Sequence, residues 1–205
     1  MILGAPREIA VVTILEAAEK IFSEHGFSGA SIAAVAREAG IPKANIHYYF
    51  STKEVLYQEV LRRTVQEWLQ ECETWLRPEN TASTALRAYI GSKLAFSRAN
   101  PHASRLFAHE IIGGARYLHD YLSTTLREAI APFGETFRVW MERGEIPQVD
   151  PTHFLFCLWA MTQWYADMQP QVTALLGKET LEESDFDAAA ETILALVLAR
   201  EDIAA

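Results

Sequence analysis

The sequence predicts an all-α protein with a three-helix helix-turn-helix domain at residues 1–53 and a larger helical bundle at residues 54–205. Three observations support this fold class. Apolar residues recur at helical spacing along almost the whole chain. Short helical segments punctuated by glycines come first, and longer helical segments follow. No segment alternates polar and apolar residues over the length that a convincing β-strand needs.

The N-terminal domain is predicted from its helix boundaries. An apolar stripe that faces a core defines the first helix, and Gly26 ends it as a left-handed residue would. Ser31 is placed to cap a second helix, which Gly40 stops. Pro42 suits the first turn of a third helix, where its missing N–H group costs nothing. The residues of the apolar stripe are Ile14, Ala17, Ala18, Ile21 and Phe22.

The larger domain is predicted to consist of longer helices. Ser51 or Thr52 caps the first of them, and Asp150 followed by Pro151 begins another. Pro132 is expected to bend the helix that contains it. The predicted helices run from residue 51 or 52 to about 75 and from about 82 to 99. The pattern stops at residues 100–101, continues through 112, and another long helix ends near residue 144. The last two predicted helices cover about 151–168 and 184–201.

Composition and charge limit the possible functions. The chain has 18 Lys and Arg against 27 Asp and Glu, a net charge of −9. Indiscriminate binding of nucleic acid is therefore not expected, although one local face can still bind phosphates. The longest apolar run, residues 154–161, is too short to cross a bilayer. Cys72 and Cys157 suit free thiols in a reducing compartment. We expect a cytoplasmic protein with no membrane partner, no metal and no cofactor.

One short segment departs from the acidic character of the chain. Residues 39–53 contain no Asp or Glu. Helical spacing directs Ile46 and Phe50 toward the core of the N-terminal domain. The opposite face then carries side chains suited to the major groove of DNA, where Asn binds adenine and Lys binds guanine or phosphate. The residues of this predicted DNA-binding face are Lys43, Ala44, Asn45, His47 and Tyr48.

Two further residues are expected to meet the DNA backbone. Ser31 and Lys53 each lie at the N-terminus of a predicted helix, where free amide groups and the helix dipole attract phosphate.

The aromatic residues at the end of the third helix have an alternative role, which is to fill the core. We expect that role for Phe50 and leave it open for Tyr49.

The residues from Ile14 to Leu56 resemble the N-terminal domain of the TetR family of transcriptional regulators. The matching motifs, in order, are HGF after the first helix, AREAGI into the turn, HYYF on the third helix and TKEVL on the fourth. The resemblance implies a homodimer that places two recognition helices in successive major grooves of a palindromic operator. It also implies a C-terminal domain that dimerises and binds a small-molecule effector. Pro42, where the family usually has Ser or Thr, and an N-terminal arm with only Arg7 depart from this pattern.

Two segments of the C-terminal half resemble the Rut subgroup of this family, which represses pyrimidine-degradation genes and responds to uracil and thymine. They are YIGSKLAFSRANPHASRLFAHEIIGGA at residues 89–115 and DPTHFLFCLWAMTQWYAD at residues 150–167. The resemblance implies that Trp68, Trp159 and Gln163 bind a small, flat, polar effector, which stacks on indole and hydrogen-bonds to the amide. A related regulator with a different effector is also compatible with these residues.

Three polar residues of this half have alternative roles. Gln163 lies in a helix that is apolar nearly all round, so its amide must find a partner, either a ligand or a neighbouring part of the chain. Arg98 and Arg105 are seven residues apart and could line the effector pocket if Pro101 permits. Pairing with Glu110 or another acidic residue is the alternative role for both arginines.

A stripe of small and aliphatic residues on the last helix suggests how the protein dimerises. Together with the helix that begins at Asp150, this last helix could form a four-helix interface with the same two helices of a second subunit. A protein that binds a palindromic operator needs such a dimer. An ordinary place in the core is the alternative. The residues of the stripe are Ala189, Ile193, Leu196 and Val197.

These observations favour a ligand-responsive DNA-binding regulator, with a repressor released by its effector as the expected mechanism. An enzyme is not expected, because the sequence has neither a nucleophile–base pair at meaningful spacing nor a phosphate-binding loop. A helical protein–protein adaptor that does not bind DNA is the alternative function. Such an adaptor has no use for the polar face around Asn45.

Overall fold

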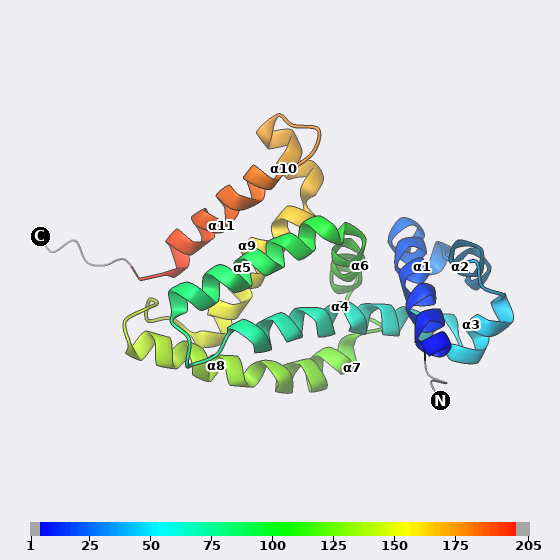
Figure 1. The fold of residues 1–205 in the computed structure, drawn as a ribbon, viewed down its shortest axis with the longest axis horizontal. Helices are drawn as coiled ribbons and strands as arrows, with labels where there is room; N and C mark the ends of the chain where they lie inside the picture. The colour runs from blue at the N-terminus through cyan, green and yellow to red at the C-terminus, as the bar shows by residue number, and fades with distance from the viewer. Residues whose placement is uncertain (1–4, 200–205) are drawn as a thin grey trace, which may run out of the picture. The chain divides into compact units, whose positions relative to one another are not determined.

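The computed structural model describes residues 5–199, and these form two compact units (Figure 1). The first unit contains the chain up to Gln66 together with His102–Ser123. The second contains Glu67–Pro101 and the chain from Thr124 onward. The fourth helix, α4 (Lys53–Trp75), begins in the first unit and ends in the second.

The first unit is built on three helices that precede α4. They are α1 (Ala5–Gly29), α2 (Ile32–Ala39) and α3 (Lys43–Tyr49), and α2 packs against both of the others. Gly26 interrupts α1 with a φ of +66° and a ψ of 174°, a conformation that glycine adopts without strain. The positive φ predicted for Gly26 is thus confirmed, but the chain continues for one further helical turn. The unit also contains most of α6 (Pro101–Ile112) and the short α7 (His119–Tyr121).

Aromatic rings and one buried carboxylate join α1, α4 and α6 within the first unit. Tyr57 on α4 packs edge-on against Phe22 at 4.9 Å and Phe27 at 5.1 Å between ring centroids. Its hydroxyl donates to Oε2 of Glu110 at 3.1 Å, while Oε1 accepts from the backbone N–H of Tyr117 at 2.6 Å. Both oxygens of a carboxylate buried at 7% exposure are therefore satisfied, as its burial requires.

The second unit is a bundle with one continuous apolar core. Its helices, besides the end of α4, are α5 (Ala82–Ala99), α8 (Arg127–Glu142), α9 (Pro151–Asp167), α10 (Gln169–Leu176) and α11 (Glu183–Val197). The α5 helix packs against α9 and α11, and α9 also packs against α8 and α10. Fully buried Leu86, Ile90, Phe137, Trp140 and Leu158 lie in this core.

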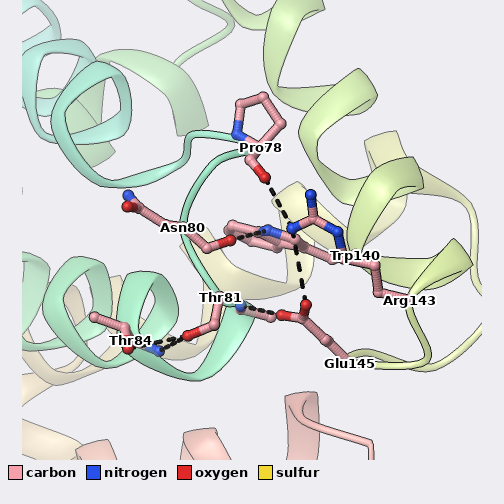
Figure 2. Close-up of polar contacts among 8 residues, drawn as sticks. Pro78, Asn80, Thr81, Thr84, Trp140, Arg143 and Glu145 are labelled. Carbon is pink, nitrogen blue, oxygen red and sulfur yellow. Dashed lines mark hydrogen bonds and ion pairs between the residues drawn. The ribbon is translucent and has the colours of Figure 1, made fainter.

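The loop between α4 and α5 is tied to the end of α8 (Figure 2). Nε1 of the fully buried Trp140 donates to the carbonyl of Asn80 at 2.9 Å. The guanidinium of Arg143 donates to the carbonyl of Pro78 at 2.9 Å and lies 3.8 Å from Oε1 of Glu145. Backbone carbonyls that have no helical partner are thereby satisfied, which fixes the loop where α4 turns into α5.

The predicted all-α class is confirmed, and the structure has no strand among residues 5–199. The α8 helix runs through Pro132 without a break, and the bend expected there stays a prediction. An irregularity that was not predicted lies earlier, in a π-helical turn at Leu122–Leu126. The α10 helix was not predicted, and α11 ends at Val197 rather than at residue 201, which lies outside the described residues. The predicted division into functional domains at residue 53 stays a prediction.

None of the helices in the described part of the chain combines the length and the apolar character needed to cross a membrane.

Candidate functional site

The face of α3 that the sequence predicts to bind DNA is exposed along its whole length. All five of its residues are accessible, and the ring of Tyr48 is 78% exposed. Tyr48 is held edge-on to Tyr49, with 5.1 Å between ring centroids. These exposed residues, which we call the α3 polar face, are Lys43, Ala44, Asn45, His47 and Tyr48.

The opposite face of α3 anchors the helix to the first unit. Ile46 is fully buried and Phe50 is 6% exposed, which confirms that both face inward. The turn before α3 is set by Gly40, which has a left-handed φ of +64°. Its N–H donates to Arg37 at 3.3 Å and the N–H of Ile41 donates to Ala36 at 3.1 Å, the two bonds of a Schellman motif. The turn therefore fixes the direction in which α3 leaves α2.

Ser31 and Lys53 occupy the helix starts that the sequence assigns to them, but their side chains have different roles. Oγ of Ser31 accepts from the N–H of Ala34 at 3.1 Å, so the predicted N-cap is confirmed. Nζ of Lys53 donates to the carbonyls of Phe27 at 2.8 Å and Ala30 at 3.1 Å, and lies 4.3 Å from the centre of the Phe27 ring. The ammonium of Lys53 thus holds α4 to the end of α1, and the expected contact with DNA phosphate stays a prediction.

The second unit contains a cluster of polar and aromatic side chains between three helices. Each helix contributes residues spaced four apart, which lie on one side of a helix. We call this set the interior cluster. Its members are Trp68 and Cys72 on α4, Tyr89 and Lys93 on α5, and Trp159, Gln163 and Asp167 on α9.

The centre of the interior cluster is the hydroxyl of Tyr89, a residue with no exposed surface. Nε1 of Trp159 donates to this hydroxyl at 2.9 Å, and Sγ of Cys72 lies 3.3 Å from it. Burial raises the pKa of Cys72 to about 11, so the group remains a neutral thiol. These bonds join α4, α5 and α9 at one point.

Lys93 brings a buried charge into the same cluster. The residue is 2% exposed, and its Nζ lies 3.9 Å from the centre of the Trp68 ring. Burial lowers the pKa of Lys93 to about 8, while Cys72 and Asp167 act in the opposite direction. The ring of Trp68 also meets Phe96 edge-on at 5.7 Å. Contact with an indole face partly compensates the ammonium for lost water.

Asp167 is the acidic counterpart of Lys93 on α9. Burial raises its pKa to about 6, against the pull of the Lys93 charge. Oδ1 of Asp167 is buried, and no hydrogen-bond donor reaches it from the described residues. Gln163, one turn earlier, is half-buried. The sequence predicted Trp68, Trp159 and Gln163 for this region but missed Lys93, Tyr89 and Asp167. A lysine within the apolar pattern of residues 82–99 was the signal available.

Arg98 and Arg105 do not join the interior cluster as a pair. The α5 helix ends at Ala99 and α6 begins at Pro101, so a spacing of seven does not place the two side chains on one helical face. Arg98 forms a solvent-exposed ion pair with Glu183 at 3.6 Å, the alternative role that the sequence left open. Arg105 belongs to the first unit and is half-buried.

The outer face of α9 is unusually apolar for a surface. Phe156 is 46% exposed and Trp164 is 48% exposed, and Ala160 lies between them on the same side of the helix. The stripe predicted on the last helix is mostly core instead. Its small and aliphatic residues pack into the second unit because α5 covers that side of α11. Ala189, Ile193 and Val197 are buried, and Leu196 alone of the stripe is exposed, at 64%.

Two family models match the chain and together span residues 14–203. Residues 14–60 match the bacterial regulatory proteins of the TetR family, and residues 61–203 match the C-terminal region of YcdC-like proteins. The chain therefore belongs to the TetR family of DNA-binding transcriptional regulators, as its motifs predicted. Members of this family are regulators and not enzymes.

The chain is similar over most of its length to named regulators. It is 37% identical to the HTH-type transcriptional regulator RutR of Escherichia coli K12, over 90% of this chain and 87% of that protein. It is 29% identical to the repressor SCO4008 of Streptomyces coelicolor, over 82% and 84% of the two chains. The crystal structure of SCO4942 from Streptomyces coelicolor has the same fold, with a TM-score of 0.71 at 23% identity over 92% and 98% of the chains.

Proposed function

We propose that the protein is a repressor that binds a palindromic operator as a homodimer and releases it when a small effector occupies the second unit. The observation that carries the DNA-binding part is the α3 polar face, which stays accessible while Ile46 and Phe50 fix the helix from behind. An amide, an ammonium, an imidazole and a phenol on one exposed helix match the groups that read base edges and phosphates.

The direct test removes the polar face and leaves the fold intact. Replacing Lys43, Asn45 and Tyr48 together by alanine should lower operator affinity by at least about a hundredfold, since each base contact contributes about 1–3 kcal/mol. Gel shifts on the promoter beside the gene, at several salt concentrations, measure the loss. Arg87→Ala, which removes an exposed cation from α5, is the control and should bind as the wild type does. Unchanged promoter binding by the triple variant would instead favour the adaptor.

The proposed effector is a flat, polar, pyrimidine-like molecule bound by Trp68, Trp159 and Gln163. The resemblance of residues 89–115 and 150–167 to the Rut subgroup supports this choice. The interior cluster supports it as well, because two indoles and an amide are brought to one region of the second unit. Uracil and thymine should lower operator affinity when titrated into the complex. Unchanged affinity at saturation would rule out either molecule as the effector.

The proposed dimer uses the outer face of α9, with Phe156, Ala160 and Trp164, and Leu196 of α11. Burying these side chains against a two-fold copy removes them from water, which favours association. The two recognition helices must then lie about 34–36 Å apart, or at another separation that follows successive major grooves. Trp164→Glu should give a monomer in analytical ultracentrifugation and weaken operator binding.

The proposed link between effector and operator is α4. Trp68 follows Lys53 by fifteen residues on one uninterrupted helix, about 22 Å along its axis. The bonds from Lys53 to Phe27 and Ala30 attach the start of α4 to the DNA-binding helices. A ligand beside Trp68 that shifts α4 can therefore move the first unit as one body. The effector must bind more tightly to the DNA-free arrangement than to the DNA-bound one for release to occur.

A further inference from the structure

A groove of about 340 Å³ lies between α8 and the start of α9, within the second unit. One face of α8 lines it, because residues 127, 131, 134 and 138 repeat at helical spacing. Arg127 and Arg138 stand at the two ends of this face, and Ala131 and Gly134 lie between them. These small residues leave the surface hollow between the arginines, and the buried Leu155 of α9 lines the hollow from the other helix.

The lining of this groove is positively charged, although the chain has a net charge of −9. Within the described part of the chain, two arginines and no Asp or Glu line it. Arg138 is paired at 2.8 Å with Glu135, which lies outside the lining. The side chain of Arg127 is exposed and forms no hydrogen bond or ion pair with any of residues 5–199. Arg127 is therefore the cation that an incoming anion can bind.

The N-terminus of α9 borders the groove but does not offer a second anion site. Oδ1 of Asp150 accepts from the N–H groups of Thr152 and His153, both at 2.9 Å, so these amides are already capped. The carboxylate of Asp150 would also repel an anion placed on the helix axis. The charged contact of a ligand therefore falls to Arg127.

The remainder of the groove is aliphatic. Ile130, Pro151 and Leu155 line it, and among the described residues it has no aromatic ring and no side-chain amide. A flat heterocycle would find neither a stacking surface nor an amide partner here, in contrast to the interior cluster. An alkyl chain needs only apolar contact. The planar fork of a guanidinium matches the two oxygens of a carboxylate.

We propose that the groove between α8 and α9 is a second small-molecule site, which binds a straight-chain aliphatic carboxylate. The carboxylate pairs with Arg127, and the alkyl chain lies over Ala131 and Gly134 against Leu155. This site is separate from the interior cluster and takes a different class of ligand. Its occupation does not depend on the proposed effector or on operator binding.

A second copy of the chain is a poorer occupant of the groove. Two α8 helices packed antiparallel across a two-fold axis at the middle of the groove would bring Arg127 of each copy toward Arg138 of the other. Like charges oppose such a contact. A carboxylate meets the same arginines with the opposite charge.

Three probes with the same alkyl chain test the ligand class in calorimetric titrations of the full-length protein. Decanoate carries the carboxylate, decanol is uncharged and decylamine carries the opposite charge. Decanoate should bind at one site per chain, and the other two should bind at least tenfold more weakly. Equal affinity for decanol would overturn the role of the charge, and absence of decanoate binding would overturn the proposal outright.

Two variants place the ligand in the groove. Arg127→Gln should weaken decanoate binding at least tenfold, because the guanidinium is lost from an exposed position. Ala131→Phe, also at an exposed position, fills the hollow and should abolish binding. Arg87→Gln, which removes an exposed arginine from α5, is the matched control and should bind decanoate normally. Wild-type affinity in both groove variants would overturn the proposal.

Two further measurements separate this site from its rivals. Lys93→Met should keep wild-type decanoate affinity, and its loss there with normal binding by Arg127→Gln would instead put the carboxylate in the interior cluster. Sedimentation of Ala131→Phe should match that of the wild type. A dimer that became a monomer in this variant would overturn the proposal, because a second copy would then cover the groove. Operator binding and the response to uracil should be unchanged in both groove variants.

Discussion

The two units place their polar side chains in opposite ways. On α3 the polar groups lie outside and the apolar ones inside, so Asn45 and Tyr48 keep their contact with water. In the second unit Lys93, Tyr89 and one oxygen of Asp167 lie inside an apolar bundle. The difference shows that an exposed polar face costs the fold little. An enclosed polar cluster, in contrast, leaves some of its groups partly unsatisfied.

The largest expected effect concerns α3, whose buried and exposed sides should differ in their contribution to the free energy of unfolding. Ile46 is the buried residue of this short helix, and Ile46→Ala should lower the free energy of unfolding by about 2–5 kcal/mol. Tyr48→Ala should change it by less than about 0.5 kcal/mol, because the ring is mostly exposed. Urea unfolding measures both, and operator binding should fall in both variants. An equal loss of stability would mean that Tyr48 belongs to the core.

The buried charge of the second unit is expected to appear in the pH dependence of stability. The pKa of Lys93 is about 8 when folded against 10.5 ordinarily, so the unfolded chain binds more protons between these values. The destabilising effect of Lys93 is complete below pH 8 and disappears as the pH rises toward 10.5. The free energy of unfolding should therefore rise over this range by about 3 kcal/mol more in the wild type than in Lys93→Met.

Urea titrations at pH 7.5, 9 and 10.5 measure the difference between the two proteins, in which the other titrating groups cancel. Lys43→Met is the matched control from the α3 polar face, and it should lose operator affinity instead. A difference between wild type and Lys93→Met that is constant with pH would show that Lys93 is hydrated in the folded state.

Lys53 is a third case, because it is neither exposed like Lys43 nor buried like Lys93. If its ammonium serves the fold, Lys53→Met should lower the free energy of unfolding by about 1–3 kcal/mol, because two carbonyls lose a charged donor. The salt dependence of operator binding should then match the wild type. A slope smaller by about one would show instead that Lys53 neutralises a phosphate in the complex.

The smallest expected effect concerns Ser31, where capping and DNA contact can be separated. Ser31→Ala should lower the free energy of unfolding by about 1 kcal/mol, since the N–H of Ala34 loses its acceptor. Ser31→Asp keeps an acceptor at this position and should retain the stability. The new carboxylate would nevertheless repel phosphate, so operator affinity should fall. Undiminished affinity in Ser31→Asp would place Ser31 away from the DNA backbone.

Local signals made several helix boundaries of both units predictable from the sequence. Gly40, Ser31 and the pair Asp150–Pro151 each act within a few residues of their own position. Oδ1 of Asp150 accepts from the N–H groups of Thr152 and His153, both at 2.9 Å, as an N-cap should. The inward direction of Ile46 and Phe50 likewise follows from helical spacing alone. Such features need no knowledge of the tertiary fold.

The interior cluster could be predicted only in part, because its contacts join helices far apart in the chain. Spacing within α5 shows a lysine among apolar residues, but it does not show that Trp68 covers the ammonium. The break between α5 and α6 also made the spacing of Arg98 and Arg105 misleading. The same limit applies to Ala189, Ile193 and Val197, since an apolar stripe does not reveal whether α5 or a second chain covers it.

The α9 helix carries two sets of side chains that point in different directions around its axis. Trp159, Gln163 and Asp167 face the cluster, whereas Phe156, Ala160 and Trp164 face outward. Inserting or deleting one residue would turn everything beyond that point by about 100° and move both sets of side chains away from their present directions. Homologues should therefore tolerate substitutions along this helix yet accept changes of length only in the loops beside it.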